Sequence, residues 1–196
     1  MKIVFATHNP NKVREINEML DNSLEIIGLE EIGCTKEIPE TQKTIQGNAL
    51  QKARHVKRNF KVDCFAEDTG LEVDALHGEP GVITARYAGP ARDANANMAK
   101  VLGKLMGQED RGAQFRTVIA LTLDGKEYTF EGIARGHIAM EKQGEKGFGY
   151  DPIFIPEGYE QTFAQLSSAE KNKISHRGKA TEQLKAFLAE YLEKEQ

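Results

Sequence analysis

The residues best suited to chemistry are two adjacent carboxylates followed by a hydroxyl and a glycine, at Glu67–Gly70. An apolar run at Val62–Ala66 leads into them and is typical of the end of a buried strand. Burying two neighbouring carboxylates is costly unless a cation or hydrogen-bond donors meet them. At the carboxyl end of a strand they could instead project into a crevice that binds a ligand.

The direction of these two carboxylates depends on whether the strand continues. A continuing strand places Glu67 and Asp68 on opposite faces, so only one of them can face a given ligand. Gly70 permits a turn that would change this, and Asp-Thr-Gly is ordinary turn chemistry. From this stretch alone, a catalytic carboxylate pair and a charged strand-to-turn transition are equal interpretations.

A second group of polar residues follows the first expected strand, Ile3–Ala6. Asn9 suits the N-cap of a helix, Pro10 suits its first position, and apolar residues recur at helical spacing over 13–20. Free backbone N–H groups, the positive end of the helix dipole and Lys12 would favour an anion there. The stretch lacks a glycine-rich phosphate loop, and a plain capped helix explains the same pattern.

Other elements must position these groups. Further strands are expected at 24–29, 71–73, 113–123, 126–139 and 153–155, and further helices at 45–60, at 93–106 and after Ser175. Asp124-Gly125 is a strong hairpin signal between the two long strands. Asn48 and Lys52 share one face of the helix at 45–60, for which solvent is the default environment. The polar loop at 30–44 adds a carboxylate, Glu40.

The stretch at 144–152 is unusual because three glycines flank two aromatic residues and Asp151 precedes a proline. Glycines let the backbone approach a ligand closely, and an aromatic ring such as that of Phe148 offers a stacking face. A mobile hairpin loop is the alternative interpretation.

The last expected helix begins with two potential cations, His176 and Arg177, behind Ser175 as its N-cap. Cations at this end oppose the helix dipole, which stability alone does not explain. A bound anion or polar ring would explain them, and Lys171 and Lys173 add donors nearby in the sequence.

Composition limits the class of protein. The 196 residues suffice for one sizeable domain. Because their net charge is −4, a broad basic face for duplex nucleic acid is not expected. Cys34 and Cys64 lack metal-like spacing, which favours a reduced, cytoplasmic protein. No apolar run approaches the roughly 20 residues of a membrane span. The first strand, from Met1, is too short for a signal peptide.

Six motifs, in order along nearly the whole chain, together resemble the Ham1/RdgB family of inosine/xanthosine triphosphate pyrophosphatases. They lie at 7–12, 48–53, 67–71, 80–89, 147–152 and 175–177. Each motif is weak alone, and six in register are highly specific. Glu67 stands where an aspartate is common in the family and Thr69 where a serine is common. Both replacements keep the chemistry.

The resemblance implies a single Ham1-like domain over 1–196 with an α/β fold. This fold has an elongated, twisted mixed sheet with flanking helices, and two lobes around a central cleft. It implies a Mg²⁺-dependent reaction in which a nucleoside triphosphate and water give the monophosphate and pyrophosphate. It also implies a cytosolic homodimer that removes deaminated purine nucleotides such as ITP, dITP and XTP.

The resemblance also assigns roles. Mg²⁺ prefers oxygen ligands, for which Glu40, Glu67 and Asp68 are available, and the family points to Glu40 and Asp68. Asp68 is the candidate to orient or deprotonate the attacking water. Phosphates, base and sugar would contact the remaining polar and aromatic residues of the motifs. These substrate-binding candidates are Thr7, His8, Asn9, Pro10, Asn11, Lys12, Lys52, Thr69, Phe148, Gly149, Tyr150, Asp151, Lys171, His176 and Arg177.

Within this set, Lys12, Lys52 and the start of the first helix would hold phosphates, with Lys171 as a further donor. Phe148 would stack on the base, and Asp151, His176 and Arg177 would surround its polar edge. Two alternatives remain open: a pyrophosphatase of modified pyrimidine nucleotides, and a non-enzymatic nucleotide- or RNA-binding module. The second leaves the carboxylate pair idle and predicts a basic chain.

Overall fold

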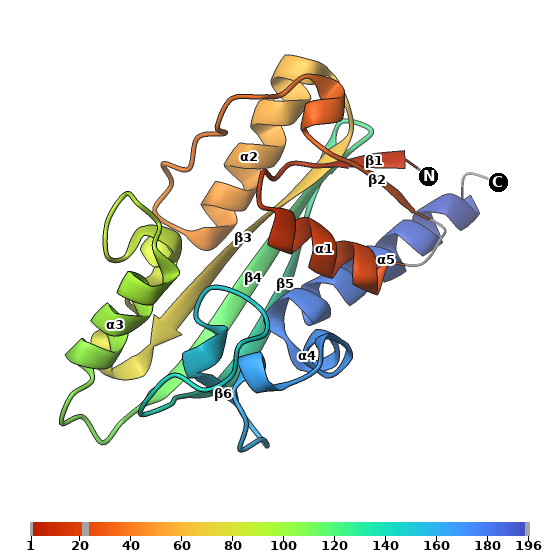
Figure 1. The fold of residues 1–196 in the computed structure, drawn as a ribbon. Helices are drawn as coiled ribbons and strands as arrows, with labels where there is room; N and C mark the ends of the chain where they lie inside the picture. The colour runs from red at the N-terminus through yellow and green to blue at the C-terminus, as the bar shows by residue number, and fades with distance from the viewer. Residues whose placement is uncertain (1, 21–23, 195–196) are drawn as a thin grey trace. The chain divides into compact units, whose positions relative to one another are not determined.

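A computed structural model describes residues 2–20 and 24–194, which form a six-stranded mixed sheet with flanking helices (Figure 1). The strand order is β2-β1-β3-β4-β5-β6. β1 pairs in parallel with β2 and β3, whereas β5 and β6 are antiparallel. The strands are β1 Lys2–Phe5, β2 Glu25–Ile27, β3 Cys64–Val73, β4 Gly112–Leu123, β5 Lys126–Ile138 and β6 Phe154–Pro156. The helices are α1 Pro10–Met19, α2 Ile45–Phe60, α3 Ala94–Lys104, α4 Ser168–Ile174 and α5 His176–Lys194.

The predicted α/β class, mixed sheet and flanking helices are therefore confirmed. Met1, where the first strand was expected to start, lies outside the described residues. Contacts divide the chain into two compact units. Unit 1 comprises 1–68, 117–132 and 177–196, and unit 2 comprises 69–116 and 133–176. The single-domain assignment and the cleft stay predictions.

The core of unit 1 lies between the sheet and helices on both of its faces. Phe5 of β1 and Phe65 of β3 stack with ring centroids 4.5 Å apart, in a cluster that includes Ile16 of α1 and the apolar side of α5. Cys64 precedes Phe65 and therefore points to the opposite face. There its Sγ lies 3.4 Å from the carbonyl oxygen of Ala53 in α2. α1 and α5 thus cover one face, and α2 covers the other.

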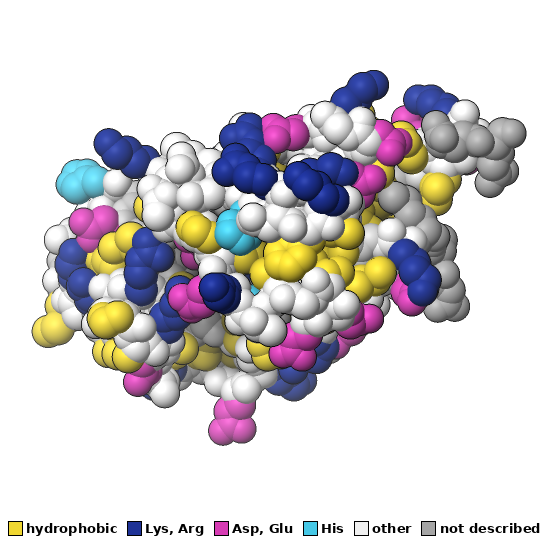
Figure 2. Space-filling view, turned by 90° about the horizontal axis from the view of Figure 1, so that it is seen from above, with side chains coloured by type: hydrophobic (Ala, Val, Ile, Leu, Met, Phe, Trp, Pro, Cys, Tyr) yellow, Lys and Arg dark blue, Asp and Glu magenta, His cyan; other side chains and the backbone are white. Residues whose placement is uncertain are grey.

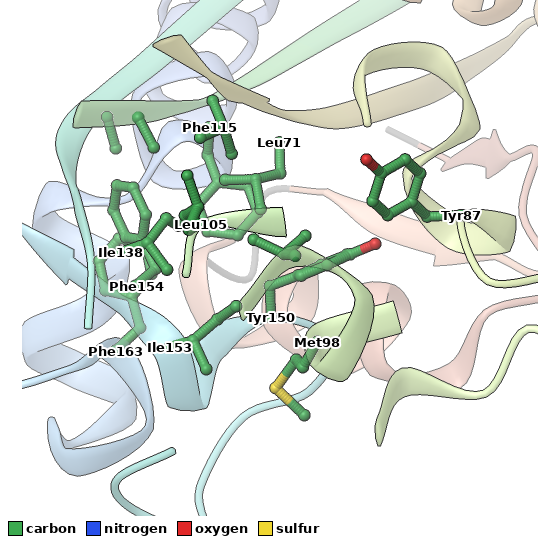
Figure 3. Packing of buried hydrophobic residues seen from close by; sticks show 14 of the residues in the cluster. Leu71, Tyr87, Met98, Leu105, Phe115, Ile138, Tyr150, Ile153, Phe154 and Phe163 are labelled. Carbon is green, nitrogen blue, oxygen red and sulfur yellow. The ribbon is translucent and has the colours of Figure 1, made fainter. Parts of the chain in front are cut away.

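The core of unit 2 is built around α3 and the ends of β3, β4 and β5 that belong to this unit (Figure 3). Met98 and Val101 of α3, and Leu105 just after the helix, are buried in this core. Phe115 of β4 packs edge-on against Phe154, with ring centroids 4.7 Å apart. This cluster also holds two buried tyrosine rings that bear on the site.

The strand that carries the two carboxylates does not turn. β3 runs without a break through Gly70, so the expected turn at Asp68–Gly70 was wrong. Gly70 permits a turn, but β3 is a central strand with hydrogen-bonded neighbours on both sides, and this pairing keeps the backbone extended. The consequence is that Glu67 and Asp68 point to opposite faces of the sheet.

Other local predictions fared differently. The hairpin at Asp124-Gly125 is confirmed, since positive φ angles of 47° and 74° are those of a two-residue type I′ turn. The helix over 45–60 has the predicted bounds. The short helix α4 was not predicted, although Ser167 and Glu170 form a capping box at its start. The segment after Pro80 contains a 3₁₀ helix, Gly81–Arg86.

Candidate functional site

Asp68 meets a buried lysine and a second carboxylate in unit 1. The Lys52 ammonium lies 2.5 Å from Glu40 Oε1 and 3.4 Å from Asp68 Oδ1. Lys52 comes from α2, one turn after Asn48, whose side chain hydrogen-bonds to Asp68. Asn48 and Lys52 are both buried, so solvent, the default environment for this pair, was the wrong expectation. The other oxygen of Asp68, Oδ2, is buried and has no hydrogen-bond partner.

The electrostatics of this cluster follow from burial and its excess of carboxylates. Burial raises the pKa of Asp68 above its ordinary value, and the charges of Lys52 and Lys12 only partly oppose this effect. Burial alone would lower the pKa of Lys52, but the neighbouring charges of Asp68 and Glu40 outweigh it and raise that pKa. The lysine therefore stays protonated, whereas Asp68 binds a proton more readily than an exposed aspartate.

Glu67, on the other face of β3, belongs to a buried network in unit 1. Arg177 donates from Nε to Glu67 Oε2 at 2.8 Å and from Nη2 to Oε1 at 2.9 Å. It also donates from Nη1 to Glu15 Oε2 at 2.6 Å. Lys12 Nζ lies 2.8 Å from Glu67 Oε1. We call these four residues, Lys12, Glu15, Glu67 and Arg177, the Arg177 network.

This network accounts for a cation at the start of the last helix. Two buried carboxylates, Glu67 and Glu15, neutralise Arg177, so a bound anion or polar ring is not needed to explain this cation. Both oxygens of Glu67 already receive hydrogen bonds or an ion pair from Arg177 and Lys12, which gives this carboxylate a structural task in place of the metal role that the sequence also assigned to it. Burial would raise the pKa of Glu67, but Arg177 and Lys12 outweigh it and hold that pKa well below its ordinary value.

The start of α1 differs from the expected anion site. Asn9 caps the helix, as predicted, and its Oδ1 accepts from the backbone N–H groups of Asn11 and Lys12 at 3.0 and 3.4 Å. These two N–H groups are therefore not free for an anion. Thr7 Oγ1 accepts from the backbone N–H of Asn9, and His8 Nε2 lies 3.1 Å from the carbonyl oxygen of Lys36. Pro10 is the first residue of the helix, as expected.

The aromatic-glycine loop forms a separate cluster in unit 2. Asp151 Oδ2 accepts from the Lys171 ammonium at 2.7 Å and from the backbone N–H of Phe148 at 2.9 Å. The same ammonium lies 5.1 Å from the centre of the Phe148 ring. A Cβ on Gly147 would run into the Asp151 carboxylate, so only glycine allows this close approach. The structure brings Phe148, Asp151 and Lys171 together, whereas the sequence grouped Asp151 with His176 and Arg177 and assigned Lys171 to phosphate.

Other predicted residues have partners of their own. His176 is buried and stacks on Phe115 with ring centroids 4.5 Å apart, in unit 2. Tyr150 donates from its hydroxyl to the carbonyl oxygen of Thr84 at 2.6 Å. Thr69 is half-buried on β3, and Gly149 is half-buried with a φ of 63°.

Sequence reasoning did not single out two residues of these clusters. Glu15 lies between apolar positions of α1, and a buried acid beside Ile16 was the available signal. Thr84 belongs to the 80–89 motif, but it contacts Tyr150 through its backbone carbonyl, which no side-chain pattern indicates.

The described residues were also compared with what a metal centre or a polyanion-binding surface would require. Over residues 2–20 and 24–194, no three His, Cys, Asp or Glu side chains gather in a metal-binding group. Figure 2 shows basic and acidic side chains mixed over the face that it draws. No helix in the described part of the chain is long and apolar enough to cross a membrane.

Known proteins resemble this chain over nearly its whole length. The Ham1 family model matches residues 3–187. A dITP/XTP pyrophosphatase of Flavobacterium psychrophilum is 54% identical, covering 96% of this chain and 99% of the relative. One of Bacillus subtilis is 47% identical, covering 94% and 96%. The solved Ham1 protein of Staphylococcus aureus is 40% identical, covers 97% of this chain and 100% of its own, and has a TM-score of 0.89.

Proposed function

The chain belongs to the Ham1 family, and we propose that it hydrolyses ITP, dITP and XTP to the monophosphate and pyrophosphate, which removes deaminated purine nucleotides from the nucleotide pool. The relatives are named dITP/XTP pyrophosphatases at 44–55% identity over most of this chain. The observation that carries the proposal to individual residues is the pair of carboxylates around Lys52, the half-buried Glu40 and the buried Asp68.

Asp68 is the proposed general base. Its pKa is raised by burial, which makes it a better proton acceptor than an ordinary aspartate once it is ionised. The attacking water would be held by its Oδ2, which lacks a partner within the protein. Lys52 and Lys12 would neutralise phosphate oxygens, since each ammonium has hydrogens beyond those used in its ion pairs.

The same residues fit a divalent cation, for which we propose Mg²⁺. Lys52 carries one positive charge against two carboxylates, and the partnerless Asp68 Oδ2 is a hard oxygen donor. Glu40 and Asp68 would hold the ion, and Glu67 would not, because its oxygens meet Arg177 and Lys12. When bound, the ion would neutralise phosphate charge and polarise the phosphoryl group.

In unit 2, Phe148 would stack on the base, and Asp151 and Lys171 would fix the loop that carries it. The single-domain assignment, the cytoplasm and a homodimer are further proposals. The single domain and the homodimer rest on the family resemblance. The cytoplasmic location is also supported by two buried free cysteines, Cys34 and Cys64. Light scattering coupled to size exclusion tests the dimer, and a mass of 21.8 kDa would contradict it.

The decisive experiment is a substrate panel with product identification. Purified protein with Mg²⁺ is offered ITP, dITP, XTP, ATP, GTP and modified pyrimidine triphosphates, and the products are separated by ion exchange. We expect ITP to give the monophosphate and pyrophosphate. Release of orthophosphate with a diphosphate, or preference for a pyrimidine, would overturn the proposal.

A further inference from the structure

The aromatic-glycine loop of unit 2 is tied to a second segment of the same unit by one tyrosine. Tyr150 lies between Phe148 and Asp151 in the chain, and its hydroxyl donates to the carbonyl oxygen of Thr84 at 2.6 Å. Its side chain is almost fully buried, with 4% of the residue exposed. The hydroxyl therefore serves a partner inside the protein and is not available to a ligand.

The acceptor of this hydrogen bond is itself held on two sides. Thr84 Oγ1 donates to the carbonyl oxygen of Gly81 at 2.5 Å and accepts from the backbone N–H of Leu71, in β3, at 2.9 Å. On the other side, Asn97 of α3 donates to the carbonyl oxygen of Ala85 at 3.0 Å. The Oδ1 of Asn97 accepts from the backbone N–H of Ala88 at 2.7 Å. Thr84 thus offers its carbonyl from a backbone anchored to a strand and a helix.

The ring of Tyr150 adds a second constraint. It packs in the hydrophobic cluster of unit 2, where Figure 3 shows its hydroxyl pointing to the side on which Tyr87 lies. Burial raises the pKa of Tyr150 well above its ordinary value, and the nearby Tyr87 adds to this effect. The hydroxyl stays protonated, so it remains a donor to Thr84 throughout the neutral and mildly alkaline range.

We propose that Tyr150 is a positioning residue, which anchors the Phe148 loop to the segment at 81–86 and thereby sets base selectivity. The inference rests on the proposed function, because it gives the loop the task of holding the base. It also gives the segment at 81–86 a task, as the fixed platform to which the loop is bonded. Tyr150 then acts through Phe148 and touches no substrate atom with its hydroxyl.

The test compares Tyr150→Phe with a matched control, Tyr87→Phe. Tyr87 is equally buried in the same cluster and also donates a 2.6 Å hydrogen bond, but to the side chain of Glu79, away from the loop. Each substitution removes one hydroxyl and keeps the ring. For Tyr150→Phe we expect KM for ITP to rise about threefold to tenfold, with kcat within about twofold, as loss of one hydrogen bond implies. The ratio of kcat/KM for ITP over GTP should fall by a similar factor, and Tyr87→Phe should leave both quantities within about twofold.

A second pair of variants tests the platform. Asn97→Ala frees the backbone around Thr84, so it should move KM and the ITP/GTP ratio in the same direction as Tyr150→Phe. The double variant should then show less than the product of the two single effects, because both act through one hydrogen bond. Equal shifts for Tyr150→Phe and Tyr87→Phe, or fully multiplicative effects in the double variant, would overturn the proposal.

Amide hydrogen exchange of the loop gives a readout without substrate. Peptides that cover 147–152 should exchange faster in Tyr150→Phe than in wild type and in Tyr87→Phe. Unchanged exchange in the loop would refute the anchor, whatever the kinetics show. A wild-type protein that does not hydrolyse ITP would refute the proposed function, and the exchange experiment would still decide whether Tyr150 holds the loop.

Discussion

Arg177 offers the sharpest test, because sequence and structure assign it different tasks. The sequence suggested that it surrounds the polar edge of the base, whereas all three nitrogens of its guanidinium meet Glu67 or Glu15 in the structure. Arg177→Ala would leave Glu15 and Glu67 buried, with Lys12 as the one cation that remains in the Arg177 network. Removing one partner of a buried ion pair typically costs about 3–5 kcal/mol.

An exposed arginine in the same unit supplies the control. Arg54 makes the same two-pronged contact with Glu127, at 2.8 and 2.7 Å, but their side chains are 51% and 39% exposed. Exposed pairs contribute roughly 0.2–1 kcal/mol, so Arg54→Ala should cost little. The pair of variants therefore compares one geometry in two environments.

Denaturant unfolding followed by circular dichroism measures both variants. We expect Arg177→Ala to lose about 3–5 kcal/mol of the free energy of unfolding, which corresponds to a fall of roughly 6–20 °C in Tm for a chain of this size. Arg177→Lys should recover only part of this loss, because an ammonium cannot reproduce the planar fork. Loss of less than about 1 kcal/mol from Arg177→Ala, together with a narrowed ITP/GTP ratio, would refute a structural role and return Arg177 to the base.

Three further predictions follow from the same contacts. Asp68→Asn keeps the shape but loses the base, so pyrophosphate release should fall by more than about 10²-fold with little change in Tm, and activity within tenfold of wild type would contradict its role. Hypoxanthine and xanthine carry an acceptor at O6 and a donor at N1, which adenine reverses, and guanine adds an amine at C2. ITP and XTP should therefore exceed ATP and GTP in kcat/KM by at least about a hundredfold in steady-state assays. Folding lowers the pKa of Glu67, so the stability that ionised Glu67 contributes is complete above pH 4.5, its ordinary pKa, and is lost as the pH falls below that value. In an acid titration of the free energy of unfolding, Glu67→Gln should lack this pH-dependent loss.

The parts of the fold that were predictable depend on short-range signals. The N-cap at Asn9, the helix over 45–60 and the hairpin at Asp124-Gly125 are each determined by a few neighbouring residues, and all three are confirmed. The prediction of a turn at Gly70 was wrong because the conformation there depends on long-range contacts. Its sequence permits a turn, but strand pairing on both sides decides the conformation, and the partner strands lie far away in the sequence.

The contacts of the candidate site show the same division. The hydrogen bond from Phe148 to Asp151 spans three residues, and the sequence indicated that this loop is a unit. The partners of Arg177 lie 110 and 162 residues away, at Glu67 and Glu15. No pattern in one sequence reveals such pairs, so the cation at the helix start was explained by a ligand instead of by the protein's own carboxylates.

The uninterrupted course of β3 explains why its two adjacent carboxylates have different tasks. Glu67 points to the face where the Arg177 network balances two acids with two bases, and it has no oxygen left for a ligand. Asp68 points to the other face, where it shares Lys52 with Glu40 and where its Oδ2 has no hydrogen-bond partner in the protein. We propose that this second face, with two carboxylates around one lysine, binds a divalent cation and the triphosphate. The alternation of a single extended strand thus separates the acid of the Arg177 network from the acid that we propose to be reactive, and a turn at Gly70 would have removed that separation.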